Sequence, residues 1–188
     1  MAKKISVKER IVETATRLFY HQGFNSTGIN QIIAEAGIAI GSLYKHFQSK
    51  EDLLCYYLQQ QETEFFSNLN EYLKNEKNAS KKILKMIDYR IDLQQKADFS
   101  GCHFIKINAE IGRQNQRIAD IVSGHKQRQY DYIKTILSET ESPENKSSAK
   151  EISARTIFLM IEGAVVSSSI LGNTDDLKNV KKTVKELL

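Results

Sequence analysis

The stretch that decides the fold is TGINQIIAEAGIAIGSLYKHFQSKEDLL, which occupies residues 27–54. Its apolar residues recur three and four positions apart, as they do on the buried face of an amphipathic helix. They predict a short helix from about Thr27 or Gly28 to Ala36, a turn at Gly37 and a second short helix over 40–47. Two short helices joined by a turn that contains glycine form a helix-turn-helix.

The second short helix divides into an inner and an outer face. Leu43 and Phe47 lie one turn apart, so both can point into a core. Burying them leaves polar side chains on the flank and the outer face: Ser42, Tyr44, Lys45 and His46. Hydroxyl, ammonium and imidazole groups in such positions can reach phosphates and base edges. Gly41 has no side chain, so a DNA backbone or base can approach it closely.

The flanking sequence is helical on both sides of this motif. A helix is predicted over 7–22, and Gly23 is expected to end it. Ser49 is a good N-cap for a long helix over 50–75, because Glu51 and Asp52 follow in its first turn. Further helices are expected near 79–95, 102–113, 115–137, 148–171 and 175–187, with a polar loop over 139–148. We therefore expect an all-α fold of about nine helices.

Charge is distributed unevenly along the chain. The chain has 188 residues and a formal net charge of +4. Residues 1–50 hold seven lysines and arginines against three glutamates, and the remaining residues hold equal numbers of basic and acidic side chains. A basic segment beside a neutral one favours a module that binds a polyanion, joined to a part with another task.

Two short segments closely resemble the DNA-binding signature of the TetR family of bacterial transcription regulators. They are Gly41-Ser-Leu-Tyr-Lys-His-Phe and Ser49-Lys-Glu-Asp-Leu-Leu, and the resemblance covers about residues 8–54. It implies a three-helix DNA-binding domain over residues 1–50 and a helical ligand-binding and dimerisation domain over 51–188. It also implies which residues would face the major groove: Asn30, Ile40, Gly41, Ser42 and Tyr44. Phosphates would be contacted by Thr27, His46 and Lys50, and Lys45 could contact either.

The motif departs from the family pattern at two positions. Ala39 stands where the family usually has a serine or threonine cap, a change that costs about 1 kcal/mol of helix stability. Ile40 offers no hydrogen bond and can only pack against a thymine methyl or a sugar. We therefore expect specificity to depend on Asn30 and on DNA shape more than on bidentate base contacts.

A short recognition helix reads few base pairs, so such modules usually act as twofold dimers on palindromic sites. Helix 148–171 is the predicted interface, because Gly163 and Ala164 allow close helix approach, and helix 175–187 would complete a four-helix bundle between subunits. The candidate interface residues are Ile157, Ile161, Ala164, Val165, Ser168, Val180 and Val184. The same stripes could instead serve only the core of one chain.

The resemblance also implies a small-molecule effector whose binding inside the C-terminal helices shifts the DNA-binding heads. The candidate ligand-binding residues are Phe65, Tyr89, Cys102, Phe104, Asn108 and Tyr130; Phe66, Phe99, Ile107 and Ile111 are further pocket candidates. An aromatic stripe at helical spacing is also typical of an ordinary core.

Cys102 lies in Gly101-Cys-His-Phe-Ile-Lys-Ile-Asn-Ala-Glu110, which resembles an element of a subset of TetR-like regulators, although His103 and Lys106 depart from the commonest residues. A thiol at a helix N-terminus beside His103 and Lys106 would favour its thiolate, which permits an electrophile or oxidant sensor. A small buried residue at a helix start is the alternative.

Other classes of protein fit the sequence less well. The chain has no His-Glu-x-x-His, phosphate-binding loop, Cys-x-x-Cys or Gly-x-Ser-x-Gly pattern, so we expect no enzyme, cofactor or metal. His103 and Glu110 lie two turns apart and could cooperate in a site, although exposed polar spacing explains them equally well. A nonspecific architectural DNA binder would need more positive charge. Repression is the expected direction of regulation, with activation as the alternative.

We expect a cytoplasmic protein without a membrane partner. The N-terminus has no apolar signal region, and Cys55 and Cys102 lie far apart in the chain. The longest uncharged stretch, Gly163–Thr174, is much shorter than the roughly twenty residues that span a bilayer.

Overall fold

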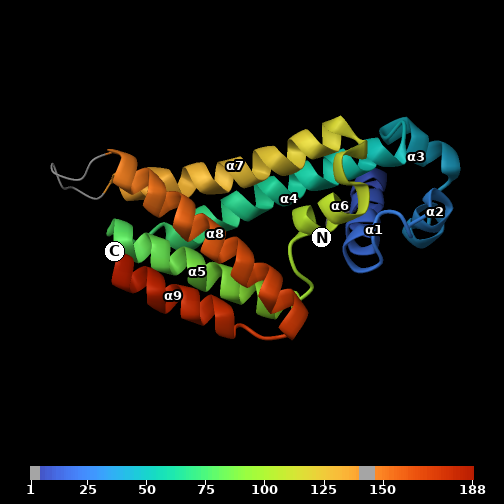
Figure 1. Ribbon diagram of the computed structural model, residues 1–188. Helices are drawn as coiled ribbons and strands as arrows, with labels where there is room; N and C mark the ends of the chain where they lie inside the picture. The colour runs from blue at the N-terminus through green and yellow to red at the C-terminus, as the bar shows by residue number, and fades with distance from the viewer. Residues whose placement is uncertain (1–4, 140–146) are drawn as a thin grey trace. The chain divides into compact units, whose positions relative to one another are not determined.

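A computed structural model describes residues 5–139 and 147–188, and these residues form nine α-helices, one 3-10 turn and no strand (Figure 1). The helices are α1 (Val7–His21), α2 (Ile29–Ala36), α3 (Ile40–His46), α4 (Lys50–Leu73), α5 (Ala79–Lys96), α6 (His103–Ile111), α7 (Gln116–Ser138), α8 (Ser147–Leu171) and α9 (Asp175–Leu187). The all-α prediction is confirmed. The loop predicted over 139–148 falls largely outside the described residues.

Side-chain caps explain where several helices begin. Ser6 and Glu9 form a complete capping box at the start of α1. The predicted cap of α4 is present, because the Asp52 amide donates to Ser49 Oγ at 3.0 Å. Gly37 ends α2 in the left-handed conformation (φ 60°), which glycine adopts without steric cost. By contrast, α3 begins at Ala39 with no side-chain cap, as its sequence predicts.

Two compact units follow from the packing. Unit 1 runs to Thr63 and adds His103–Val122, and unit 2 comprises Glu64–Cys102 and Ser123–Leu188. This division differs from the boundary expected at residue 50, because the start of α4 and all of α6 belong with the helix-turn-helix. In unit 1, α1, α2 and α3 pack on one another around Ile11, Phe19 and other buried apolar side chains.

Unit 2 is built around α5, α8 and α9, which pack against one another, with the second halves of α4 and α7 completing its core. In Figure 1, α9 lies alongside α5 within this unit. Its core contains the side chains predicted to form a dimer interface. Of those seven residues, Ile157, Ile161, Ala164, Val165, Ser168 and Val184 are buried by helices of the same chain, and Val180 packs against the core.

The predicted interface stripe is therefore part of the intramolecular core. The prediction that these side chains lie between two subunits is wrong. Helix α8 is apolar on its opposite face as well, where Leu159, Val166 and Ile170 are exposed. Periodicity alone could not distinguish these two faces.

By length and composition, Ser153–Leu171 within α8 is apolar enough to cross a membrane. Its buried face packs in the core of unit 2, however, and Glu162 within it forms ion pairs with Arg90 and Lys126. Burial of one face and pairing of this charge explain the composition of α8 without a bilayer.

Candidate nucleic-acid interface

Helix α3 presents a polar outer face on an apolar base. Leu43 is fully buried and Phe47 nearly so, whereas Ile40 and Tyr44 are 56% and 49% exposed. Lys45 and His46 are exposed on the same outer surface. The structure therefore gives α3 the two faces that its spacing predicts, and the outer one can reach a groove or a phosphate backbone.

The surface beside α3 is open at two further predicted positions. Asn30 is exposed in the first turn of α2. A Cβ atom added at Gly41 would have no neighbour within 4 Å, so the backbone there is accessible to a close approach. Ser42 is half-buried on the flank. These residues and the exposed face of α3 form the candidate DNA-contacting surface.

The three predicted phosphate contacts differ in availability. His46 is exposed. Lys50 is half-buried, with Nζ 4.0 Å from the centroid of the Phe24 ring, and burial lowers its pKa. The Thr27 side chain is buried, and its hydroxyl donates to the Gly23 carbonyl oxygen at 2.6 Å. Its predicted phosphate contact is therefore corrected: the hydroxyl closes the loop between α1 and α2.

Some basic side chains of unit 1 already interact with other side chains of the same unit. Arg17 forms an ion pair with Glu35, which joins α1 to α2 and lowers the pKa of that carboxyl group. Lys8 Nζ lies 4.1 Å from the centroid of the Tyr56 ring. Lys45 remains exposed at the end of α3, so of these cations it is the one best placed to meet DNA.

Helix α6 is hydrogen-bonded to α1 and to the loop between α1 and α2, within unit 1. Lys106 Nζ donates to the Tyr20 carbonyl oxygen at 2.5 Å. The Glu110 carboxylate accepts a hydrogen bond from the backbone N–H of Asn25 at 2.8 Å, in the loop before α2. Both contacts explain why α6 forms part of this unit despite its distance in sequence.

His103 begins α6 between two tyrosine rings. It stacks on Tyr20 with ring centroids 3.9 Å apart, and its Nδ1 shares a hydrogen bond with the Tyr57 hydroxyl. Burial of the ring, together with the nearby charge of Lys106, lowers the pKa of His103 to about 4. His103 is thus neutral at physiological pH, and it and Glu110 contact different parts of unit 1 rather than a shared site.

The predicted ligand-binding residues do not gather in one place. Phe65 and Tyr89 line a small cavity in unit 2 with a volume of ≈ 20 Å³. Tyr130 is buried in the same unit, beneath the guanidinium of Arg155 and beside Phe158. Phe104 and Asn108 belong to unit 1, where Phe104 is buried and Asn108 exposed. Phe65 and Tyr89 are the two candidates that a cavity brings together.

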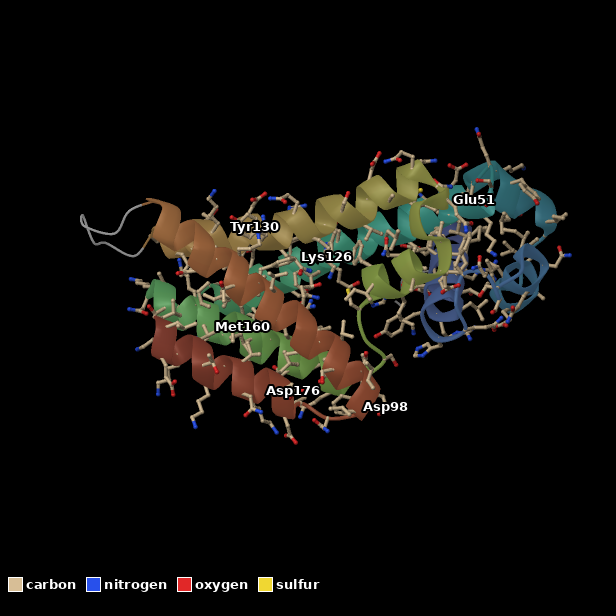
Figure 2. The ribbon with its side chains drawn as sticks, in the orientation of Figure 1. Glu51, Asp98, Lys126, Tyr130, Met160 and Asp176 are labelled. Carbon is tan, nitrogen blue, oxygen red and sulfur yellow. The ribbon has the colours of Figure 1, made fainter. Side chains whose placement is uncertain are left out.

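Cys102 lies partly buried against the core of unit 2, and Lys126 Nζ lies 3.5 Å from its Sγ (Figure 2 labels Lys126). The cations predicted beside it have other roles, since His103 is neutral and Lys106 is bound to Tyr20. Cys55 is buried, and burial raises the pKa of its thiol.

A buried charged cluster in unit 2 was missed by the sequence analysis. Arg90 of α5, Glu162 of α8 and Lys126 of α7 meet there. One signal could have found it: Arg90 occupies a core position in the stripe Ile83, Ile87, Arg90 and Gln94, where an apolar residue is expected.

Comparison with known proteins identifies the class to which this fold and surface belong. Residues 11–56 match the model of the bacterial regulatory proteins of the tetR family. A curated relative, the HTH-type transcriptional regulator SAUSA300_2515 of Staphylococcus aureus, is 32% identical over 88 residues, which make up 46% of this chain and 47% of the relative. The match spans about half the length of the curated relatives.

Solved structures extend the likeness to nearly the whole chain. SCO4454, a TetR-family transcriptional regulator from Streptomyces coelicolor, is 25% identical with a TM-score of 0.82, over 96% of this chain and 85% of that one. A TetR regulator from Legionella pneumophila has the same fold, with 20% identity and a TM-score of 0.83 over the full length of both chains. These matches define an all-helical regulator class with an N-terminal helix-turn-helix. Residues 11–56 therefore belong to the TetR family of bacterial regulatory proteins, and the chain as a whole has the fold of solved TetR-family regulators.

Proposed function

We propose that this protein is a transcriptional regulator that binds a palindromic DNA operator as a homodimer and represses transcription until a small molecule releases it. The outer face of α3 carries the proposal, because Tyr44, Lys45 and His46 are exposed above the buried side chains of Leu43 and Phe47. The family match over residues 11–56 covers this surface. Such a protein would act in the cytoplasm, where duplex DNA is accessible.

Operator binding is tested with DNA that flanks the protein's own coding region. Asn30→Ala and Tyr44→Ala should each weaken specific binding about tenfold or more, since each removes a base or backbone contact of about 1–3 kcal/mol. Tyr72→Ala, an exposed tyrosine of α4 in unit 2, is the matched control and should bind normally. Full specific affinity in both α2 and α3 variants, measured by fluorescence anisotropy, would contradict the assignment.

A salt series separates a regulator from a nonspecific DNA binder. Affinity for both specific and random DNA falls as salt rises, because counterions are released from phosphates in both complexes. A regulator keeps a large affinity ratio between the two DNAs across the series. A ratio near one at every salt concentration would favour the architectural alternative.

The proposed dimer uses the exposed face of α8 rather than its buried one. Leu159, Val166 and Ile170 line this face at helical spacing, and Ile170 is 76% exposed. Gly163 lies between them and permits close approach of a second helix. Ile170→Glu should shift the protein to monomers in sedimentation, whereas Gln127→Glu, which adds the same charge to exposed α7, should leave the dimer intact.

The effector must bind the released state more tightly than the DNA-bound state, because equal affinity would shift nothing. Activation instead of repression would appear as lower expression after deletion of the gene.

A thiol-sensing function is the second candidate, and the contact of Cys102 with Lys126 favours it. The thiolate is the reactive form of cysteine, and reactive cysteines are commonly found beside cationic side chains. Cys102→Ser should then abolish release from DNA by thiol-reactive agents, and Cys55→Ser should not. An unchanged response of Cys102→Ser removes this candidate.

A further inference from the structure

Arg90 is a buried cation in the core of unit 2. It is 7% exposed and lines the small cavity, together with Phe65, Tyr89 and Phe158. A fully buried arginine is costly unless its charge and its donors are matched by acceptors. A buried guanidinium therefore requires acceptors for its N–H donors and a negative charge beside it.

The carboxylate available to Arg90 is shared with another cation. Glu162 Oε1 lies 3.5 Å from an Arg90 terminal nitrogen, at the outer limit of a hydrogen bond, whereas Glu162 Oε2 lies 2.5 Å from Lys126 Nζ. The side chains of all three are largely buried. The three groups carry a net charge of +1, and the shorter contact belongs to Lys126.

Two polar atoms on this face of α5 have no hydrogen-bond partner in the described part of the chain. They are Arg90 Nε and Gln94 Oε1, one helical turn apart. Buried donors and acceptors in native proteins are nearly always paired, so each such atom indicates a missing partner. An unpaired Nε on a guanidinium lacks an acceptor, and a carboxylate supplies two acceptors in the geometry that the guanidinium fork matches.

Apart from Arg90 and Gln129, the walls of the cavity are aromatic and apolar. The Arg90 guanidinium carbon lies 5.3 Å from the centroid of the Phe65 ring, and Phe65 and Tyr89 meet edge to face with centroids 5.6 Å apart. Leu69, Met86 and Ile133 complete much of the lining. Such a site combines one strong anion contact with planar apolar surfaces.

We propose that the small cavity beside Arg90 binds a small organic anion with a planar apolar body and one carboxylate, and that Arg90 contacts the carboxylate. This proposal rests on the proposed function, because it names the chemical class of the effector. The carboxylate neutralises the excess charge of the cluster and provides the acceptor that Arg90 Nε lacks. The aromatic walls enclose the apolar body.

Because the cavity is small, such a ligand would bind only to a conformation in which the cavity is wider. A volume of ≈ 20 Å³ holds about one water molecule, so an aromatic acid enters only if the lining side chains move apart. Phe65 is partly buried and is the lining ring best placed to move. A ligand that requires a widened cavity stabilises that conformation over the closed one, which is the differential binding that an effector needs.

Calorimetric titration of the full chain without DNA tests the ligand class. The probes are benzoate, 2-naphthoate and indole-3-acetate, each compared with its neutral amide, and acetate as an anion without an apolar body. We expect at least one aromatic carboxylate to bind about tenfold or more tightly than its amide and than acetate. The proposal is overturned if no carboxylate of the panel binds more tightly than its amide.

Variants test the role of Arg90. Arg90→Met keeps an unbranched side chain in the core and leaves Glu162 paired with Lys126, so the fold should persist. It should reduce carboxylate affinity about tenfold or more without changing affinity for the amide. Arg90→Lys keeps the charge but not the fork and should give an intermediate loss. Arg128→Met is the matched control, because Arg128 also stacks on a phenylalanine, Phe66, at an exposed position of unit 2.

Unchanged carboxylate binding in Arg90→Met, with native helicity by circular dichroism, overturns the assignment of Arg90. Operator binding is measured separately on the same variants, so the two proposals fail independently. Loss of carboxylate discrimination with intact operator binding removes only this inference. Normal carboxylate binding by a chain that binds no operator removes only the proposed regulatory function.

Discussion

Polar side chains are arranged in opposite ways on the outer face of α3 and in the cluster around Arg90. On α3, Tyr44 and Lys45 project into solvent above a core that does not include them. In unit 2, Arg90 and Glu162 lie inside the core itself. Exposed polar groups are solvated without a partner, whereas buried ones depend on each other. Substitution of the exposed polar side chains of α3 should therefore alter binding and spare stability, and substitutions in the cluster should alter stability.

The largest expected effect comes from breaking the buried cluster. Glu162→Gln leaves the charges of Arg90 and Lys126 without their shared carboxylate, which should lower the free energy of unfolding of unit 2 by about 3 kcal/mol. Lys45→Gln on α3 should change stability by no more than about 0.5 kcal/mol. Urea unfolding followed by circular dichroism measures both. Similar losses in the two variants would contradict the contrast.

A second prediction compares a buried histidine with an exposed one. The pKa of His103 is about 4 in the folded chain, below the ordinary value of 6.5, so the native state favours the neutral ring. Its contribution is complete above pH 6.5 and is lost as the pH falls towards 4, because the unfolded chain takes up the proton first. Stability should fall by about 2 kcal/mol between pH 7.5 and pH 5.

His103→Phe retains a ring on Tyr20 but cannot take up a proton, so it should flatten this pH dependence. His46→Phe, at an exposed position on α3, should not. Thermal unfolding at several pH values measures the difference. A native chain whose stability is constant over this pH range would show that the ring is not held neutral.

The helix ends and the two faces of α3 could be predicted because they depend on residues that are close together in the sequence. Helix ends follow from caps and glycines, such as Ser49 and Gly37, whose effects act within one turn. The inner and outer faces of α3 follow from the spacing of Leu43 and Phe47, because only one face of so short a helix is apolar. The candidate DNA-contacting surface was therefore accessible to sequence reasoning.

The features that the sequence could not predict depend on packing between segments that are distant in the chain. Both faces of α8 are apolar, so periodicity could not show that Ile161 lies in the core and Ile170 on the surface. Arg90 acquires its partners from α7 and α8, which no local pattern identifies. The family resemblance implies a phosphate contact for Thr27, but its hydroxyl donates to the Gly23 carbonyl oxygen in the closed loop.

The third prediction separates binding from stability at a single exposed position. Gly41→Leu should stabilise α3 by up to about 1 kcal/mol, because glycine is a poor helix former and the new side chain meets nothing in the chain. The same side chain should obstruct DNA and reduce operator affinity about tenfold or more, equivalent to about 1.4 kcal/mol. Gly124→Leu is the control, since Gly124 is an equally open glycine on α7. It should stabilise the helix and leave operator affinity unchanged.

The smallest expected effect concerns the uncapped start of α3. Ala39 has the extended backbone of an N-cap (φ −76°, ψ 147°) but no side chain that can accept from the first amides of the helix. Ala39→Ser supplies that acceptor and should raise the stability of unit 1 by about 1 kcal/mol. Gly28→Ser at the start of α2 should add only a few tenths, because glycine is already a better N-cap than alanine. Urea unfolding measures the gain in the free energy of unfolding for each variant. Equal gains from the two serines would indicate that the serines act by restricting the backbone rather than by capping the helices.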